Sequence, residues 1–600
     1  MPSPSPADRR PVYVERDEAQ RRLTAIEREK SLRSLAWFAR YSWPILESTP
    51  LHWTPWLQAQ CDTLQALFEG HLVASGKGTP AMVERHRAFY RAVSIEPDVG
   101  ALLVQDLYVN GFPGSLKSRF AMVIGPAWVW LHDPTFTIAA TSGTGDNVSR
   151  DSNMMKELVS SAWYRATFEI AWHVGVNRSG AVVDSVGEWH NSAGGYRLSK
   201  ELFSSWQGVH VDYLAVDDPD DAMKVWGEAD RLRARRKVTA IRNRVKDPTR
   251  SIRLVVQQRV HPEDVTGWTI KKGTWSPATP ESRALPAVLS IPLEFRPSRR
   301  CTTPWGWTDP RTEAGQVAHP ERYTAAFRAA ERLAYGSSGY EGQYNQNPEV
   351  IEGGWYKRQH WRWFRLPEDA TDPAPRPEGC RPRTGEGSDP AFELGRRKDG
   401  TLDVDTVAIS VDATFGSLSD DASAVGLTAC AIAAGRRLVL EDVTAPMTYT
   451  QTEEALCLMI VRWAAQAPGR IVEVLVEKKA NGAAVVDRIK KMLAEASLKD
   501  AAGRLIVPRL VLLETEGGKA VRGRAAMPTV EAGLVYLRDG AVWLNEWVGE
   551  VSGFPHAARD DRFDALTQMI IHYADHTSAA AESAAYRNMG AALSGLRLRC

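Results

Sequence analysis

Short apolar runs alternate with helical patterns through the first half of the chain. The runs have the length of buried β-strands and fall at residues 103–109, 137–141, 182–186, 213–216 and 252–256. Strands that alternate with helices build an α/β sheet whose working loops lie at the strand ends. The pattern therefore predicts an α/β domain over residues 35–360.

The strand pattern restarts in the second half. Apolar runs at 406–411, 424–433, 437–440 and 471–476 precede a helical pattern that begins at Asp560. Between the two halves, residues 361–403 are rich in proline and glycine, which predicts a linker without a core of its own. A second domain is expected over residues 404–577, followed by a mobile tail over 578–600.

The N-terminal region divides into two parts. Residues 1–34 are polar and charged, which predicts a flexible arm. An aromatic-rich helical region follows, and we favour packing in the core over the alternative of contact with an adenine base. The residues concerned are Trp37, Phe38, Trp43, Trp53, Trp56 and Leu57.

Composition is consistent with more than one domain. The chain has 600 residues, of which 44% are hydrophobic and 21 are tryptophan, enough for two or more cores. No apolar run approaches the roughly 18 residues of a membrane span, and the start lacks the apolar region of a signal peptide, so we expect a cytoplasmic protein without a membrane partner.

Cysteine usage and charge narrow the chemistry. The six cysteines form no C-x-x-C pair and have no nearby histidines, which argues against a zinc site and a disulfide scaffold and predicts free thiols. The net charge is only +1, so any contact with nucleic acid must come from local basic patches.

Residues 107–118 carry the most informative motif. The segment Leu-Tyr-Val-Asn-Gly-Phe-Pro-Gly-Ser-Leu-Lys-Ser leads from an apolar strand through a turn to a helix start at Lys117 and Ser118. Backbone N–H groups and the helix end hold a nucleotide phosphate in such a turn, while the lysine neutralises the outer phosphates and the serine reaches Mg²⁺.

The turn departs from the phosphate-loop pattern G-x-x-x-x-G-K-[ST] at one place. Gly111 and Ser115 fit the loop, but Leu116 stands where the second glycine is expected. A glycine supplies backbone freedom at that point, and we expect Gly114 to supply it here instead.

Residues 211–219 complete a possible ATP site. The sequence Val-Asp-Tyr-Leu-Ala-Val-Asp-Asp-Pro predicts a buried strand that ends in Asp217 and Asp218. The first carboxylate at such a strand end can hold magnesium, and the second can orient or deprotonate the attacking water. An ordinary strand-to-turn signal is the alternative. Both motifs together, in this order, favour an ATP-hydrolysing P-loop domain.

Three acidic landmarks follow in the second half. Asp412 ends the first strand, Glu477 ends a later strand, and Asp560, Asp561 and Asp564 open the last helix. Carboxylates placed in this way can converge on two divalent metals that activate water and stabilise the leaving oxygen, as in an RNase H-like nuclease. The alternative is that acids simply favour strand ends and first helical turns.

On these residues, the chain resembles the large terminase subunit of tailed bacteriophages and prophages over most of residues 35–575. The most specific matching pieces are 113–118, 141–142 with 150–152, 194–197 before 211–219, 257–267, 342–348, 476–482 and 556–564. The resemblance implies an α/β protein with an N-terminal P-loop (ASCE-type) ATPase domain and a C-terminal RNase H-like nuclease domain.

The resemblance implies roles in the ATPase half. Lys117 would bind phosphate, Ser118 and Asp217 would hold Mg²⁺, and Asp218 would activate water. That last position is often Glu in the family, so the shorter Asp218 is a departure. Residues 257–259 match the segment that couples hydrolysis to movement, although they also fit a polar strand exit.

An arginine finger is expected to stabilise the transition-state charge. Arg150 is the candidate because of its place after the second strand. Arg119 and Arg259 are the alternatives.

The resemblance also implies roles in the nuclease half. Asp412 and Glu477 match the first two metal-binding acids. Asp561 is the first choice for the third, with Asp560 and Asp564 as alternatives. An acid that usually follows the second position is here Lys478, and Lys479 would contact the scissile phosphate or pack its stem on the sheet.

Two basic clusters could touch DNA through phosphates without reading sequence. For the cluster between Arg231 and Arg244, a solvated helix face balanced by Glu228 and Asp230 is an equally good interpretation. The first cluster is Arg231, Arg233, Arg235, Arg236, Lys237, Arg242 and Arg244, and the second is Lys519, Arg522 and Arg524.

The resemblance implies ATP-driven movement of double-stranded DNA into a procapsid and metal-dependent cutting of concatemeric DNA. Expected cofactors are ATP and Mg²⁺, with Mn²⁺ as an option in the nuclease site. Expected partners are the portal protein, the small terminase subunit and further copies in a ring docked on the procapsid, in the host cytoplasm. The alternatives are a helicase-like motor with a degenerate nuclease half, and a scaffold that hydrolyses nothing.

Overall fold

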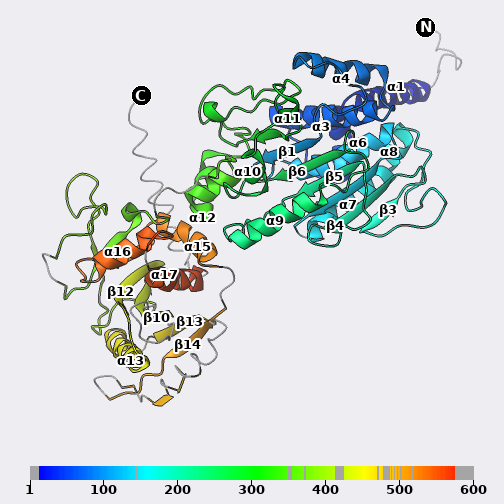
Figure 1. Ribbon diagram of the computed structural model, residues 1–600. Helices are drawn as coiled ribbons and strands as arrows, with labels where there is room; N and C mark the ends of the chain where they lie inside the picture. The colour runs from blue at the N-terminus through cyan, green and yellow to red at the C-terminus, as the bar shows by residue number, and fades with distance from the viewer. Residues whose placement is uncertain are drawn as a thin grey trace, which may run out of the picture. The chain divides into compact units, whose positions relative to one another are not determined.

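The computed structural model describes two compact units. It describes residues 12–143, 145–222, 224–348, 354–369, 373–412, 425–468, 470, 472–477, 487, 490, 491, 494, 495, 498, 499, 503–514, 518–557 and 559–574. One unit comprises Met1–Arg328 with Ser338–Glu349, and the other Ala329–Ser337 with Val350–Cys600. Each unit is built on one sheet with helices on it (Figure 1).

The first sheet has the order β3-β4-β2-β5-β6-β1-β7, and every neighbouring pair except β3 with β4 is parallel. One strand, β6, therefore lies between β1 and β5. This order is typical of ASCE-type P-loop ATPases, and ligands bind at the carboxyl ends of such parallel strands. The strands are β1 Asp106–Gly111, β2 Thr137–Ser142, β3 Glu188–His190, β4 Tyr196–Glu201, β5 Tyr213–Asp217, β6 Ile252–Gln257 and β7 Ala287–Ile291.

Helices cover this sheet, and several begin at side-chain caps. Ser34 caps α2, and Thr54 and Thr79 cap α3 and α4, each before a proline at the first helical position. The helices are α1 Val12–Arg33, α2 Leu35–Leu46, α3 Pro55–Ala74, α4 Pro80–Ala92, α5 Lys117–Arg119, α6 Gly125–His132, α7 Gly145–Ser160, α8 Ala162–Thr167, α9 Glu228–Ile241, α10 Val265–Ile270, α11 Pro280–Arg283 and α12 Ala325–Gln343, with a π-helical turn at Phe120–Ile124 between α5 and α6.

The aromatic region packs in large part, although Trp37 is 37% exposed. Phe38, Trp43, Trp56 and Leu57 on α2 and α3 are buried in the core of the first unit. Their burial removes a large apolar area from water, which stabilises the unit.

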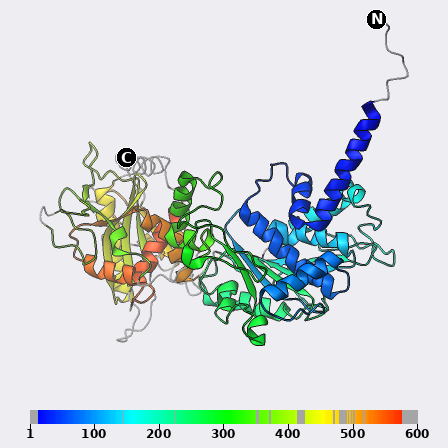
Figure 2. The ribbon, with the colours of Figure 1, turned by 90° about the horizontal axis from the view of Figure 1, so that it is seen from above.

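The N-terminal segment differs from the expected flexible arm. Residues 12–33 form α1, whose first half extends beyond the rest of the unit in Figure 2. Its second half packs: the indole Nε1 of Trp128 donates to the carbonyl of Ser31 at 2.8 Å, and Arg28 pairs with Glu169 at 2.8 Å. Residues 18–23 of α1 are exposed to solvent.

The second sheet has the order β14-β13-β10-β11-β12-β15-β8-β9. Strands β10, β11 and β12 are antiparallel, while β13 and β14 run parallel to β10. This five-strand arrangement is typical of RNase H-like domains. The strands are β8 Arg362–Arg365, β9 Phe392–Glu393, β10 Thr406–Asp412, β11 Val425–Ala433, β12 Arg436–Ala445, β13 Val472–Glu477, β14 Arg509–Leu513 and β15 Val535–Arg538.

Helices cover both faces of β10. Ile409 clusters with Leu456 of α13 (Tyr449–Gln466), whereas the hydroxyl of Ser410 donates to Gln568 of α17 (Asp561–His572) at 2.8 Å. Successive strand residues point to opposite faces, so α13 and α17 lie on opposite sides of the sheet. The remaining helices here are α15 Lys519–Glu531 and α16 Leu544–Gly553.

Two expectations about elements are wrong. Residues 361–403 are not a separate linker, because they supply β8 and β9 and bury Leu394 and Leu402 in the second core. Residues 182–186 form no strand, and the strand of that region is the more polar β4.

None of the helices that the structure describes is both long and apolar enough to cross a membrane. The described cysteines, Cys61, Cys301, Cys380, Cys430 and Cys457, are free thiols.

Candidate nucleotide and metal sites

The phosphate loop joins β1 to α5. Gly114 has φ +75°, and Leu116 has φ +58° and ψ 12°, the left-handed conformation. Both residues therefore adopt a backbone conformation that favours glycine. For Leu116 this conformation costs roughly 1–2 kcal/mol. Such strain is typical of ligand-binding loops.

Side chains from distant segments hold the loop. The amide of Gln60 on α3 donates to the carbonyl of Ser115 at 3.0 Å, and the hydroxyl of Tyr323 donates to that of Pro113 at 2.6 Å. Ser115 itself is buried, and its hydroxyl has no partner in the described structure. A Cβ at Gly111 would lie 2.7 Å from that hydroxyl, so glycine is needed at the loop's start.

Lys117 is 6% exposed, and no hydrogen bond or ion pair neutralises its ammonium within the described part of the chain. Burying an unpaired charge is costly. A bound phosphate would remove that cost, and the residue fits the expected phosphate-binding role.

Ser118 and Asp217 meet across the site. The Ser118 hydroxyl donates to Oδ1 of Asp217 at 2.7 Å, although 99 residues separate them. Burial, and then the charge of Asp218, raise the pKa of the Asp217 carboxyl, while Lys117 opposes the shift. A hydroxyl beside a carboxylate is an oxygen donor set that suits Mg²⁺.

Asp218 lies in a strained turn next to residues 257–259. It has φ +39°, and its Oδ1 accepts from the backbone N–H of Gln258 at 3.0 Å. Gln257, at the end of β6, is buried, and neither atom of its amide has a partner in the described structure. The register sets Gln257 beside Asn110 of β1, so an amide with unused hydrogen-bonding capacity lies at the site.

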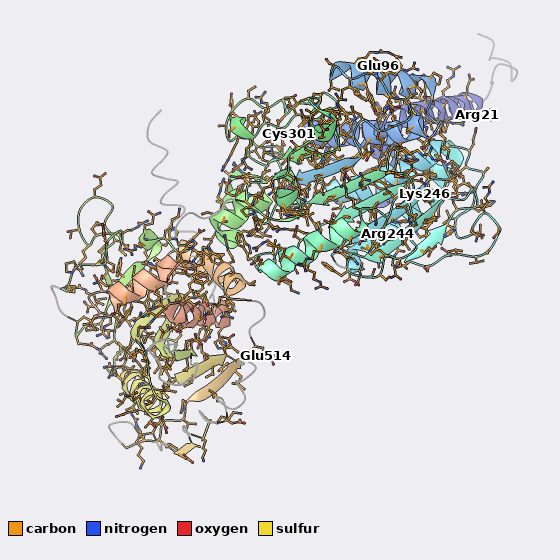
Figure 3. All side chains as sticks on the ribbon, viewed as in Figure 1. Arg21, Glu96, Arg244, Lys246, Cys301 and Glu514 are labelled. Atoms are coloured by element: carbon orange, nitrogen blue, oxygen red, sulfur yellow. The ribbon has the colours of Figure 1, made fainter. Side chains whose placement is uncertain are left out.

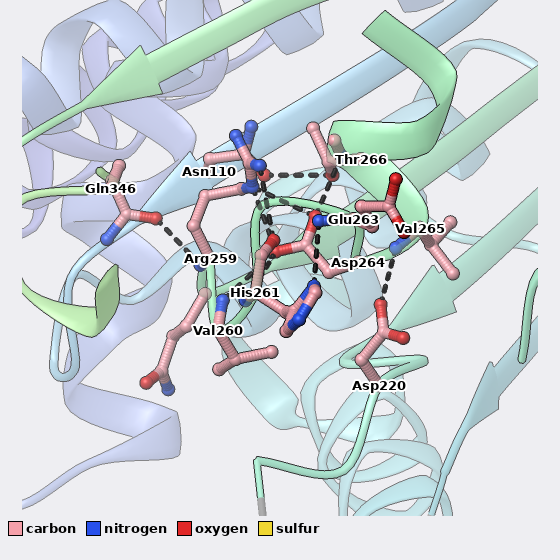
Figure 4. Close-up of polar contacts among 12 residues, drawn as sticks. Asn110, Asp220, Arg259, Val260, His261, Glu263, Asp264, Val265, Thr266 and Gln346 are labelled. Carbon is pink, nitrogen blue, oxygen red and sulfur yellow. Dashed lines mark hydrogen bonds and ion pairs between the residues drawn. The ribbon is translucent and has the colours of Figure 1, made fainter. Parts of the chain in front are cut away.

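Arg259, one of the alternatives for the arginine finger, is held by an internal ion pair. Its Nε donates to both oxygens of Asp264 at 2.9 Å, and its backbone N–H donates to Gln346 at 3.1 Å (Figure 4). Asp264 also caps α10 through the N–H of Gly267 at 2.7 Å. Both members of the Arg259–Asp264 pair are buried, so the guanidinium already has an internal partner.

The other two candidate arginines meet on Asp151. Arg119 and Arg150 each donate to Oδ1 of Asp151 at 3.1 Å, and the charge of Asp151 acts on Asp217. Arg119 is also held by Glu47 at 2.9 Å, whereas the Arg150 side chain is 51% exposed. Arg150 is therefore the more available of the two.

In the second unit, Asp412 and Glu477 end neighbouring parallel strands. Val411 and Val476, the residues just before them, are register partners. Strands lie about 4.8 Å apart, so the two acids lie side by side. Asp412 also pairs with Gly426, where a Cβ would lie 3.4 Å from that of Asp561. The structure thus brings Asp561 next to this pair.

Two basic side chains from α15 enter the acidic cluster. Arg522 donates to Glu477 at 3.3 Å and to Asp564 at 2.7 Å. Lys519 donates to Asp560 at 2.6 Å and lies 2.8 Å from Asp564. All five positions predicted for the metal site therefore belong to one region, together with two cations that were predicted to contact DNA.

This pairing bears on the expected DNA-binding patch and on the expected metal site. Lys519 and Arg522 are ion-pair partners of the acids and do not form an open DNA-binding patch with Arg524, whose guanidinium packs over Trp355 at 4.8 Å. Among the residues described, no group of three or more potential ligands is arranged to hold a metal ion. Lys478 and Lys479 lie outside the described residues.

The basic stretch on and after α9 is largely occupied by local contacts. Arg231 donates to the carbonyls of Val225 and Trp226, Arg235 to that of Glu263, and Lys237 to that of Ser204. Arg242 pairs with Asp106. Arg244 follows the end of α9 (Figure 3).

Comparisons with solved structures find similar folds. The large terminase of a thermophilic bacteriophage is 10% identical, with 82% of this chain and 98% of that chain covered and a TM-score of 0.41. The HK97 bacteriophage large terminase is 12% identical, with 81% and 98% covered and a TM-score of 0.27. The human cytomegalovirus terminase nuclease domain is 15% identical, with 30% and 86% covered and a TM-score of 0.24. The similar proteins are terminases.

These likenesses concern the fold, and the assignment of a function rests on the chain's own residues. No protein-family model matches the chain, and no curated protein matches its sequence.

Proposed function

We propose that the chain is the large subunit of a phage terminase, which uses ATP to move double-stranded DNA into a procapsid and cuts concatemeric DNA. The observation that carries the proposal is the meeting of Ser118 and Asp217 beside the unpaired, buried Lys117. A hydroxyl, a carboxylate and an ammonium at the carboxyl ends of parallel strands fit Mg²⁺ and a triphosphate.

In the ATPase site, Gly111, Gly114 and Ser115 form the phosphate loop around Lys117. Ser118 and Asp217 would hold Mg²⁺, which would neutralise the charge that develops on the phosphates. Asp218 orients the attacking water, and Arg150 serves as the arginine finger. The hydrogen bond from Gln258 to Asp218 supports a role for the 257–259 segment in coupling, because a change at the acid alters that bond.

In the nuclease site, Asp412, Glu477 and Asp561 would hold Mg²⁺ or Mn²⁺, with Asp560 and Asp564 beside them. Divalent metals held there would supply the activation of water and the stabilisation of the leaving oxygen. We further propose that the chain acts in the host cytoplasm as a ring on the procapsid, with the portal protein and the small terminase subunit as partners.

One observation favours a second candidate, a DNA motor whose nuclease half is degenerate. Arg522 and Lys519 already neutralise Glu477, Asp560 and Asp564. Cations so placed compete with metal ions for the same oxygens.

A paired assay on the purified full chain tests both halves. DNA-stimulated ATP hydrolysis is expected, and Lys117→Ala should lower it at least about 100-fold, because the lysine neutralises charge in the transition state. Mn²⁺-dependent nicking of a plasmid is expected, and Asp412→Asn should abolish nicking while ATP turnover persists.

The outcomes separate the candidates. ATP turnover without nicking at any metal concentration would favour the degenerate nuclease. No ATP turnover in the wild type, with or without DNA, would reject the motor and leave the scaffold hypothesis.

A further inference from the structure

A segment remote in sequence crosses the phosphate loop. Tyr323 is buried, its hydroxyl donates to Pro113, and its ring packs edge-on against Phe112 at 5.2 Å between centroids. Tyr323 N–H also donates to the carbonyl of His319 at 2.9 Å, which closes a turn just before α12. The turn is thereby fixed against the first half of the loop.

The residue before Tyr323 lies on the loop itself. A Cβ built at Gly114 would lie 2.9 Å from Nη2 of Arg322 and 3.2 Å from its Cζ. The guanidinium therefore fills the space that any side chain at position 114 would need. Gly114 has a second reason to be glycine, beyond its φ of +75°.

The guanidinium of Arg322 has no ion-pair partner in the described part of the chain. Arg322 is exposed, and in the described part of the chain no carboxylate or carbonyl binds it. Its nearest neighbour of note is the ring of Tyr323, 5.5 Å from Cζ. The adjacent Glu321 lies 3.8 Å from His319 instead.

Two cations thus flank the phosphate loop, Lys117 at its helical end and Arg322 over Gly114, and in the described structure neither makes an ion pair. Backbone N–H groups between them carry partial positive charge. The phosphate groups of one bound nucleotide can accept from Lys117, from Arg322 and from the backbone N–H groups between them. The planar guanidinium of arginine suits two phosphate oxygens at once.

We propose that Arg322 is a second phosphate-binding cation of the nucleotide site. This inference rests on the proposed binding of ATP. Tyr323 is its positioning residue, because the hydrogen bond to Pro113 sets where the neighbouring guanidinium lies.

Nucleotide titrations of the full chain test the proposal, with ATPγS and AMP as ligands in the presence of Mg²⁺. Arg322→Ala should weaken ATPγS binding about 10- to 100-fold, the usual worth of a charge-assisted hydrogen bond. Binding of AMP, which lacks the outer phosphates, should change less than about 3-fold. Arg322→Lys should be intermediate, because it keeps the charge without the fork.

Matched variants sharpen the test. Arg87→Ala removes another exposed arginine, on α4, and should leave ATPγS affinity unchanged. Tyr323→Phe should weaken ATPγS binding less than Arg322→Ala does, since the guanidinium remains. Melting temperatures of all variants within about 2 °C of the wild type would show that each is folded.

Wild-type affinity for ATPγS in Arg322→Ala, together with loss of binding in Lys117→Ala, would overturn the role of Arg322 and leave the proposed function standing. Equal weakening of ATPγS and AMP would also overturn it, because a merely structural residue does not discriminate phosphates. Absence of ATPγS binding by the wild type would overturn both proposals.

Discussion

At the residue scale, the two candidate sites differ in how their charges are balanced. Lys117 is buried and makes no direct ion pair in the described structure, whereas Glu477 and Asp564 share the guanidinium of Arg522. A site that lacks its counter-charge favours a ligand that brings one. A site that already contains its counter-charge binds a metal ion only in competition with it.

Arg522→Gln should destabilise the chain by roughly 3–5 kcal/mol, because it removes the guanidinium that two buried carboxylates share. Mn²⁺ should recover more stability in this variant than in the wild type, since a divalent ion can take the place of the guanidinium. Calorimetric unfolding with and without Mn²⁺ measures both effects.

Arg462→Gln is the matched control. It removes an arginine of the same unit whose side chain is 55% exposed and paired with Glu441. Exposed pairs contribute little, so its melting temperature should barely change. An Arg522→Gln variant as stable as this control would contradict the account of the acidic cluster.

At the scale of elements, the apolar runs predicted most strands because burial on both faces leaves a continuous hydrophobic signal. The apolar run at 182–186 predicted a strand that is not formed, and Val182 is 79% exposed. Strand β4 was not predicted, because many of its residues are polar. The proline-rich stretch 361–403 adds strands at the edge of a sheet, where proline is tolerated. A segment rich in proline and glycine, which cannot form a core by itself, can still contribute residues to the core of a larger unit.

The acids of both sites were predictable, because each ends a strand or opens a helix. Their partners were not. Gln60, Tyr323 and Arg522 act through contacts with residues tens to hundreds of positions away, and nothing in their local sequence indicates these contacts. Long-range pairing is decided by the fold, not by a motif.

The start of α10 gives a prediction at this scale. Asp264→Ala removes both the helix cap and the partner of buried Arg259, so urea unfolding should show a loss of about 3–5 kcal/mol. Thr279→Ala removes the exposed cap of α11 and should cost only about 1 kcal/mol. Equal losses would mean that the Arg259 pair contributes nothing beyond capping.

At the scale of the whole molecule, each unit has its own core. Buried clusters around β1 and β6 belong to one unit, and the cluster around β10 and α13 to the other. Units with separate cores are expected to unfold in separate transitions.

Ligands should therefore act on different transitions. ATPγS at about 100 times its Kd should stabilise the first unit by about 2.7 kcal/mol, and Mn²⁺ should shift only the second. Scanning calorimetry distinguishes the two, and Lys117→Ala should remove the ATPγS shift alone. A single transition that responds to both ligands would refute independent unfolding.

The anchoring of the phosphate loop has a consequence for dissection of the chain. One tether comes from 55 residues upstream of the loop and the other from 210 residues downstream. A fragment that stopped after β6 would retain residues 107–118 and 211–219 yet lose the downstream tether. Such a truncated fragment should fail to bind nucleotide, because the phosphate loop is held in shape only when the downstream segment is present.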